Sequence, residues 1–256
     1  MKFDPFSKLI PNTSPEARVS REGDRVRLQI PAGKADQYRL AQLDDCAGQA
    51  RYRFHWKPPL TLHFRARASH ASLPGTWGVG LWNDPFSLNL GMGGGTRRFP
   101  TIPNAAWFFF ASPPNYLSFH NAPSAQGWLA QTFRAPPVPT WMFAPAVVGL
   151  PLFAWKPLSR ALRPLLRRIV PHVTTQISVE VTTWHAYALE WRKDAVTFFV
   201  DGNPILRTNI VPRPPLGLVC WVDNQYLAFP PEGGLHYGTL PTPEPAWIEL
   251  EALQIG

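Results

Sequence analysis

The chain has 256 residues, of which 45% are hydrophobic and 16% charged, and this composition excludes a largely disordered protein. Its 30 prolines and 18 glycines argue against long uninterrupted helices and predict many turns. The formal net charge of +8 comes from one region, because residues 85–179 contain eight lysines and arginines and no aspartate or glutamate.

The first twenty residues and the small number of cysteines predict an intracellular protein. The first twenty residues have no apolar run behind a basic start, so we expect no secretory signal and a cytoplasmic location. Only Cys46 and Cys220 are present, which excludes a disulfide framework and predicts reduced thiols, although a single bridge stays open. No histidine spacing completes a zinc site, and we expect no cofactor. Calcium held by backbone oxygens would leave no pattern.

Short strands follow one another along the chain. In chain order, alternating or uniformly apolar runs predict strands at 24–31, 60–68, 77–82, 105–111, 176–182, 186–191, 195–200, 216–222 and 247–255. The runs at 77–82 and 105–111 are apolar on both faces, which is typical of central strands. About ten short strands separated by turns predict an all-β sandwich or barrel.

Residues 136–172 interrupt this pattern. Residues 141–155 are uncharged but too short and too broken by proline to span a bilayer. Residues 156–170 then place leucines at helical spacing and predict an amphipathic helix kinked by Pro164. Its other positions carry the basic residues Arg160, Arg163, Arg167 and Arg168.

Two interpretations of this basic helix stay open. It either packs on the sandwich with a solvated basic face, or it is a lid or an element that contacts an anionic membrane surface. The arginines alternate with leucines and not with the Gly/Ser or aromatic residues of a nucleic-acid surface, so we expect no nucleic-acid partner.

Residues 184–191, WHAYALEW, and the following strand with Asp201-Gly202 carry a resemblance. They resemble the His-x-Tyr-x-x-x-Trp … Phe-x-x-Asp-Gly signature of the concanavalin A-like lectins and glucanases, and glycoside hydrolase family 16 is the nearest member. The resemblance implies a single jelly-roll domain over residues 1–256, made of two antiparallel sheets, with 136–172 as an insertion. It also implies a concave ligand cleft and a structural role for His185.

The same resemblance bears on hydrolysis. Catalytic members carry a Glu-x-Asp-x-Glu strand across the cleft, where alternation places the carboxylates on one face. The corresponding strand here is either 80–85, which offers only Asp84, or 105–111, which offers no carboxylate. We therefore do not expect a standard two-carboxylate glycosidase.

Two aspartates are the candidate catalytic residues. Asp84 follows Trp82 by two positions and Asp223 follows Trp221 by two, so each pair shares a face if its strand continues. A carboxylate among tryptophans has a raised pKa and can act as a general acid. The alternative is that both are turn residues at strand ends whose oxygens bind local backbone.

Aromatic and amide side chains near these aspartates are the candidate ligand-binding residues. They are Trp82, Asn83, Trp107, Phe109, His120, Trp221, Asn224 and Tyr226. Such an aromatic floor suits contact with sugar rings or with a carbocation, whereas simple core packing is the alternative. His120 is either a proton shuttle or a solvated loop histidine. The glycine-rich residues 91–95 predict a flexible loop over the cleft more than a phosphate loop.

Three functions follow from these residues. The first is a ligand-binding protein for carbohydrate on a glucanase-like scaffold. The second is an enzyme of cyclase, isomerase or hydratase type that acts on a bulky apolar, terpenoid or lipid-like substrate, with Asp84 or Asp223 as the acid. The third is a structural protein whose aromatic residues are all core.

Overall fold

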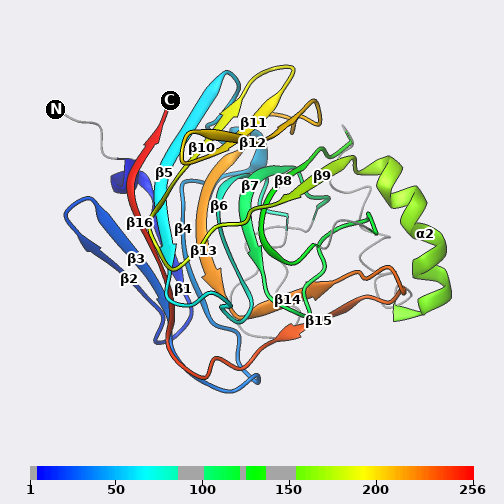
Figure 1. Cartoon of the computed structure of the whole chain (residues 1–256), viewed down its shortest axis with the longest axis horizontal. Coiled ribbons are helices and arrows are strands. Elements are labelled where there is room, and N and C mark those ends of the chain that lie inside the picture. The colour runs from blue at the N-terminus through cyan, green and yellow to red at the C-terminus, as the bar shows by residue number, and fades with distance from the viewer. Residues whose placement is uncertain (1–4, 86–100, 122–124, 137–153) are drawn as a thin grey trace.

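A computed structural model describes residues 5–85, 101–121, 125–136 and 154–256 and has two seven-stranded antiparallel sheets (Figure 1). Sheet A has the order β1 (Ile10–Thr13), β4 (Leu40–Asp44), β13 (Gly217–Asp223), β6 (Thr76–Trp82), β7 (Ala105–Ala111), β8 (Gly127–Phe133) and β9 (His172–Gln176). Sheet B has the order β12 (Asn203–Thr208), β11 (Val196–Val200), β10 (His185–Trp191), β5 (Leu60–Ala68), β16 (Ala246–Ile255), β3 (Arg25–Ile30) and β2 (Arg18–Glu22). The predicted all-β sandwich is confirmed.

Smaller elements complete the described part of the chain. Two 3₁₀ turns, η1 (Pro5–Lys8) and η2 (Arg51–Arg53), precede the central strands. The hairpin of β14 (Gln225–Ala228) and β15 (His236–Thr239) and the helix α2 (Lys156–Ile169) lie on the side of sheet A that is turned away from sheet B (Figure 1). In chain order α2 stands between the neighbouring strands β8 and β9, and it includes Pro164.

The predicted strands match the observed ones with one exception. The strand predicted at 176–182 is wrong, because β9 ends at Gln176. The residues that follow make a turn, in which the backbone N–H of Thr183 donates to the carbonyl of Glu180 and the Thr182 side chain donates to the Glu180 carboxylate. The resemblance implied a structural role for His185, and in the structure its Nδ1 lies 2.7 Å from Oδ2 of Asp201 at the β11–β12 turn.

The main core lies between the two sheets. The indoles of Trp77 and Trp128 stack with 4.0 Å between ring centroids. Phe108 of β7 reaches across to Phe198 of sheet B, with 5.1 Å between the rings. β6 and β7 are buried along their whole length, because one face packs into this core and the other into a second apolar cluster. Both cysteines are buried free thiols.

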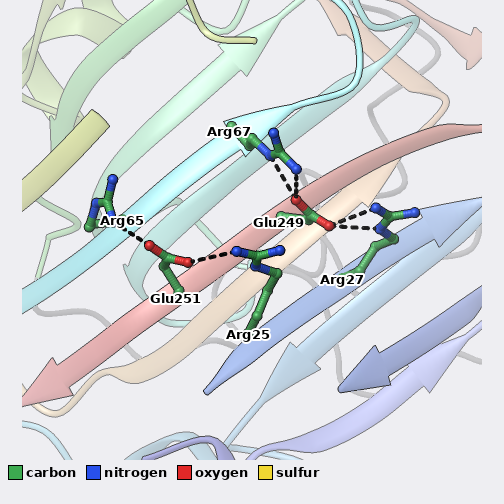
Figure 2. Close-up of polar contacts among 6 residues, drawn as sticks. All are labelled: Arg25, Arg27, Arg65, Arg67, Glu249 and Glu251. Atoms are coloured by element: carbon green, nitrogen blue, oxygen red, sulfur yellow. Dashed lines mark hydrogen bonds and ion pairs between the residues drawn. The ribbon is translucent and has the colours of Figure 1, made fainter. Parts of the chain in front are cut away.

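An ion-pair network joins three strands on the outer face of sheet B (Figure 2). Glu249 of β16 accepts hydrogen bonds from Arg27 of β3 and Arg67 of β5. Glu251 likewise pairs with Arg25 and Arg65. Burial opposes ionisation of Glu249, but the two guanidiniums outweigh it and hold its pKa below the usual range. This face of sheet B is therefore occupied by internal pairs, and the candidate site lies on sheet A.

Candidate functional site

Four of the predicted residues gather on the face of sheet A that is turned away from sheet B. Trp82, Trp107, Phe109 and Trp221, which we call the aromatic face, belong to one buried cluster. Ring centroids of Trp221 lie 5.7 Å from Trp107, 5.9 Å from Phe109 and 6.1 Å from Trp82. The rings lie together, as predicted, but all four are buried and none lines the pocket described below, so their packing is that of a core cluster and their predicted role toward a ligand stays a prediction.

Two glycines of β6 make room for neighbouring residues of sheet A. A Cβ on Gly78 would lie 2.5 Å from the Trp221 ring, and a Cβ on Gly80 would lie 2.5 Å from the Cα and Cβ of Trp107. Real Cβ atoms essentially never come so close, so glycine at position 78 makes room for the Trp221 ring and glycine at position 80 makes room for the adjacent backbone of β7 at Trp107. The alternation of glycine with apolar residues at 77–81 is thus a signal of this packing that the sequence itself carries.

Buried polar groups orient the two central indoles. Nε1 of Trp107 donates to Oε1 of Gln131 at 3.0 Å, and the amide of Gln131 then donates to the carbonyl of Leu117. Nε1 of Trp221 donates to Oγ1 of Thr76 at 2.9 Å, and this hydroxyl donates to Asp223 at 2.7 Å. Gln131 and Thr76 were not predicted as site residues, although a single glutamine in the apolar run 127–133 was a signal.

Asp223 is strongly perturbed by its burial. Burial raises its pKa to about 7, against the opposing effect of hydrogen bonds from Thr76, Gln225 and Tyr38. It ends β13 and shares a face with Trp221, as predicted, because both hydrogen-bond to Thr76. At neutral pH a large fraction of this carboxyl keeps its proton.

Asp84 and Asn83 lie beyond the end of β6. Asp84 has a φ of 50°, so the strand alternation that would place it beside Trp82 does not reach it. Its backbone oxygen accepts a hydrogen bond from Arg51. The Asn83 amide donates to the carbonyl of Ile102 and accepts from the N–H of Asn104. These two residues join the end of β6 to the segment that leads into β7, and their predicted roles toward a ligand stay predictions.

Asn224 and His120 are engaged with the protein itself. The Asn224 amide accepts from the N–H of Arg39 and donates to the carbonyls of Gln37 and Leu240. Nε2 of His120 lies 3.2 Å from the carbonyl of His172. Both positions support loops in this structure, and neither side chain lines the pocket described next.

An open pocket of about 770 Å³ lies between the loop after β7 and the β14–β15 hairpin and contains the predicted residue Tyr226. Its apolar lining comes from Tyr116, Tyr226, Ala228 and the prolines 113, 114, 230 and 231, and its polar lining from Asn121, Gln126, Glu232 and His236. A long-range bridge closes its base, where Tyr116 pairs with Ala228. Tyr116 was not predicted, because nothing local brings residue 116 to the β14–β15 hairpin.

The four arginines of α2 differ in their exposure to solvent. Arg160, Arg167 and Arg168 are exposed, whereas Arg163 is buried. A surface that contacts a membrane can therefore include the first three but not Arg163.

Within residues 5–85, 101–121, 125–136 and 154–256 no helix has the length and apolar character needed to cross a bilayer. The same residues hold no cluster of three metal-ligating side chains, and the glycines at 91–95 lie outside them.

The two-sheet architecture of the chain is similar to that of solved structures with a known fold. A glycoside hydrolase family protein from Mycobacterium thermorestibile is 11% identical, with a TM-score of 0.52 over 93% of this chain and 79% of the other. A glycoside hydrolase family 16 endo-glucanase from Bacteroides ovatus is 10% identical, with a TM-score of 0.50 over 95% and 86%. The chain has a concanavalin A-like fold of the family 16 type.

The likeness concerns the fold alone, because both solved structures are nearly as different in sequence as unrelated chains. No protein-family model matches the chain, and no curated protein matches it. The concanavalin A-like jelly roll expected from residues 184–202 is confirmed. A fold of this kind does not determine an activity, so the function depends on the side chains that the scaffold carries.

Proposed function

We propose that this protein binds carbohydrate on a glucanase-like scaffold and does not hydrolyse it by the two-carboxylate route. The observation that carries the proposal is the composition of β7, which crosses the middle of sheet A. The positions of β7 on the aromatic face are Ala105, Trp107, Phe109 and Ala111. Because side chains alternate between the two faces of a strand, carboxylates at these four positions would all point to the aromatic face. The chain has aromatic rings and alanines there instead.

The other carboxylates on this face are too far apart to act as a pair. Asp223 lies opposite Leu40, and Asp44 lies opposite Val219. Four positions along β4 thus separate the two aspartates, which is about 13 Å. Retaining glycosidases need roughly 5–5.5 Å between the two carboxyl groups and inverting ones roughly 6.5–9.5 Å. This spacing supports a binding role over hydrolysis.

The pocket between the loop after β7 and the β14–β15 hairpin has the chemistry of a sugar site. The rings of Tyr116 and Tyr226 offer surfaces for the C–H face of a pyranose. Asn121, Gln126, Glu232 and His236 supply hydrogen-bonding groups around them. Its volume of about 770 Å³ is in the range of small-molecule sites. A short oligosaccharide fits this combination of apolar platform and polar rim.

Replacing Tyr226 by alanine tests this proposal. We expect Tyr226→Ala to weaken the binding of mixed-linkage β-glucan tetrasaccharides roughly tenfold, because the variant removes one aromatic platform. Isothermal titration calorimetry measures the affinity, and a reducing-end assay measures hydrolysis, which we expect to be absent. The matched control is Tyr237→Ala, which removes an exposed tyrosine of β15 that does not line the pocket. Equal affinity of the wild type and Tyr226→Ala would contradict the proposed site.

A second candidate function is favoured by the raised pKa of the Asp223 carboxyl. A carboxyl with a pKa of about 7 can donate a proton at neutral pH, and through Thr76 it is linked to the indole of Trp221. An acid beside aromatic rings suits protonation of an alkene in an apolar substrate, where the rings stabilise the resulting carbocation.

Mass spectrometry of small molecules that co-purify with the protein separates the two functions. If the protein is such an enzyme, Asp223→Asn is expected to accumulate an isoprenoid-like substrate that the wild type converts. Asp24→Asn, at an exposed turn residue, serves as the control. Identical extracts from the wild type and Asp223→Asn would remove the enzymatic alternative.

A further inference from the structure

The helix α2 is attached to the sandwich through its polar side. Ser159 is fully buried, and its hydroxyl donates to the carbonyl of Lys156 and accepts from the N–H of Gly234. Arg163, with 4% of its surface exposed, donates to the backbone carbonyls of Phe229 and His120. A helix packed on an apolar core normally buries its leucines, and here serine and arginine take that place.

Aromatic rings hold the buried guanidinium in position. The Cζ atom of Arg163 lies 5.2 Å from the ring centroid of Phe229 and 5.8 Å from that of Tyr116. Nη2 of Arg163 also donates to Oδ1 of Asn121 at 3.3 Å. These bonds attach α2 to the loop after β7 and to the β14–β15 hairpin. They leave the apolar side chains of the helix free to point elsewhere.

Three large apolar side chains of this segment are exposed to solvent. Trp155, the residue at the N-cap of α2, is 64% exposed, Leu165 is 51% exposed and Ile169 is 38% exposed. They are half of the six large hydrophobic residues that are exposed in the described part of the chain. Leu158, Leu162, Leu165 and Ile169 fall within an arc of about 60° on a helical projection. Leu158 and Leu162 are half-buried, so the exposed end of this stripe consists of Leu165 and Ile169. Exposed apolar side chains that gather in this way mark an interaction surface.

The charged side chains of α2 itself are all basic, although Glu232 of the β14–β15 hairpin loop lies beside the helix, where its carbonyl accepts a hydrogen bond from Arg160. Arg160, Arg167 and Arg168 are exposed on the same helix, and residues 85–179 contain no aspartate or glutamate. The partner must therefore offer an apolar layer with negative charge beside it. A bilayer with anionic headgroups has this combination, since apolar side chains enter the boundary of the acyl chains while arginines reach the phosphates.

We propose that the exposed side of α2, which carries Trp155, Leu165, Ile169 and Arg168 and has Arg160 and Arg167 at its far edge, docks on an anionic lipid bilayer. Ser159 and Arg163 attach the opposite side of the helix to the rest of the protein, and α2 lies at the edge of the molecule (Figure 1). Asn121 lines the pocket and accepts a hydrogen bond from Arg163. Docking through α2 thus brings the pocket close to the membrane surface.

Cosedimentation of the full chain with vesicles tests this surface. The vesicles contain either equal parts of phosphatidylcholine and phosphatidylglycerol or phosphatidylcholine alone, in low salt. We expect the wild type to bind the anionic vesicles at least tenfold more tightly. The double variant Arg167→Glu/Arg168→Glu and the double variant Leu165→Ser/Ile169→Ser should each lose about tenfold or more of this affinity.

Matched variants on another surface control for general charge and apolarity. Arg192→Glu/Lys193→Glu reverses two exposed charges in the β10–β11 turn, and Tyr52→Ser removes an exposed ring. Both should bind like the wild type, and circular dichroism checks that every variant is folded. The proposal is overturned if the wild type ignores anionic vesicles, if the α2 variants bind as well as it does, or if the controls lose as much. Binding to polyglutamate but not to vesicles would also overturn it, in favour of an acidic protein partner.

Discussion

Raising the pH from about 4 to about 7 is expected to lower the stability of the wild type relative to Asp223→Asn by roughly 3 kcal/mol. The reason is that the buried carboxyl of Asp223 has a pKa of about 7 in the folded protein, whereas an unfolded aspartate titrates near 3.9. Between these two values the folded state holds a proton that the unfolded state has lost. The stability linked to this proton is fully present below the unfolded pKa and is lost as the pH rises through the folded one.

The comparison with Asp223→Asn isolates the contribution of the Asp223 carboxyl to the pH dependence of stability. Other groups titrate in the same range, and His172 acts in the opposite direction because burial lowers its pKa to about 4, so it stabilises the fold as the pH rises. Burial also raises the pKa of Asp45. Both groups are present in the two proteins and cancel in the difference. The carboxyls of Glu249 and Asp201, whose pKa values are lowered, lose their contribution only under more acidic conditions.

Urea unfolding at pH 4, 5.5 and 7 measures the expected difference. The quantity compared is the free energy of unfolding of the wild type minus that of Asp223→Asn at each pH. The variant is a close match, because the oxygen of an asparagine amide at this position can still accept the hydrogen bond from Thr76. Two parallel pH profiles would show that the carboxyl titrates normally, and would remove the support for an acid role.

The central strands could be predicted because they bury both faces. The runs 77–82 and 105–111 are uniformly apolar, and β6 and β7 occupy these positions in the middle of sheet A. Three of the strands that were missed, β4, β1 and β2, have weaker patterns, whereas β8 was missed although it is mostly apolar. β4 carries Gln42 and Asp44 on the aromatic face, where the two side chains bond to each other. β1 and β2 are exposed edge strands with little alternation, so backbone pairing and not hydrophobic pattern defines them.

The site was predictable only in part. Alternation in β7 correctly placed Trp107 and Phe109 on one face, but the pocket depends on contacts between distant loops such as Asn115 and Leu227. The leucine spacing predicted the helix that the structure has as Lys156–Ile169. It did not predict that Arg163 would face inward, since the carbonyl groups that bind this side chain belong to the distant residues 229 and 120. Partners so far away in the chain leave no local signal.

Removing the indole of Trp107 is expected to lower the free energy of unfolding by about 3–5 kcal/mol. Trp107 is 1% exposed, and its ring packs against Phe109, Phe133 and Trp221 at centroid distances of 5.6, 6.0 and 5.7 Å. Alanine would leave a cavity among these rings. It would also leave Oε1 of Gln131, a fully buried side chain, without the hydrogen bond from Nε1.

Two further variants separate packing from hydrogen bonding. Trp107→Phe keeps an aromatic ring but removes the Nε1 donor, so we expect a loss of about 1–3 kcal/mol. Trp155→Ala removes a tryptophan that is 64% exposed, and it should change the stability by less than about 0.5 kcal/mol. Urea unfolding at neutral pH measures all three. If Trp107→Ala behaves like Trp155→Ala, the aromatic face is not packed as a second core. A large loss of stability in Trp107→Ala, with a smaller loss in Trp107→Phe, would mean that β7 carries packing residues at the positions where a hydrolytic strand carries carboxylates.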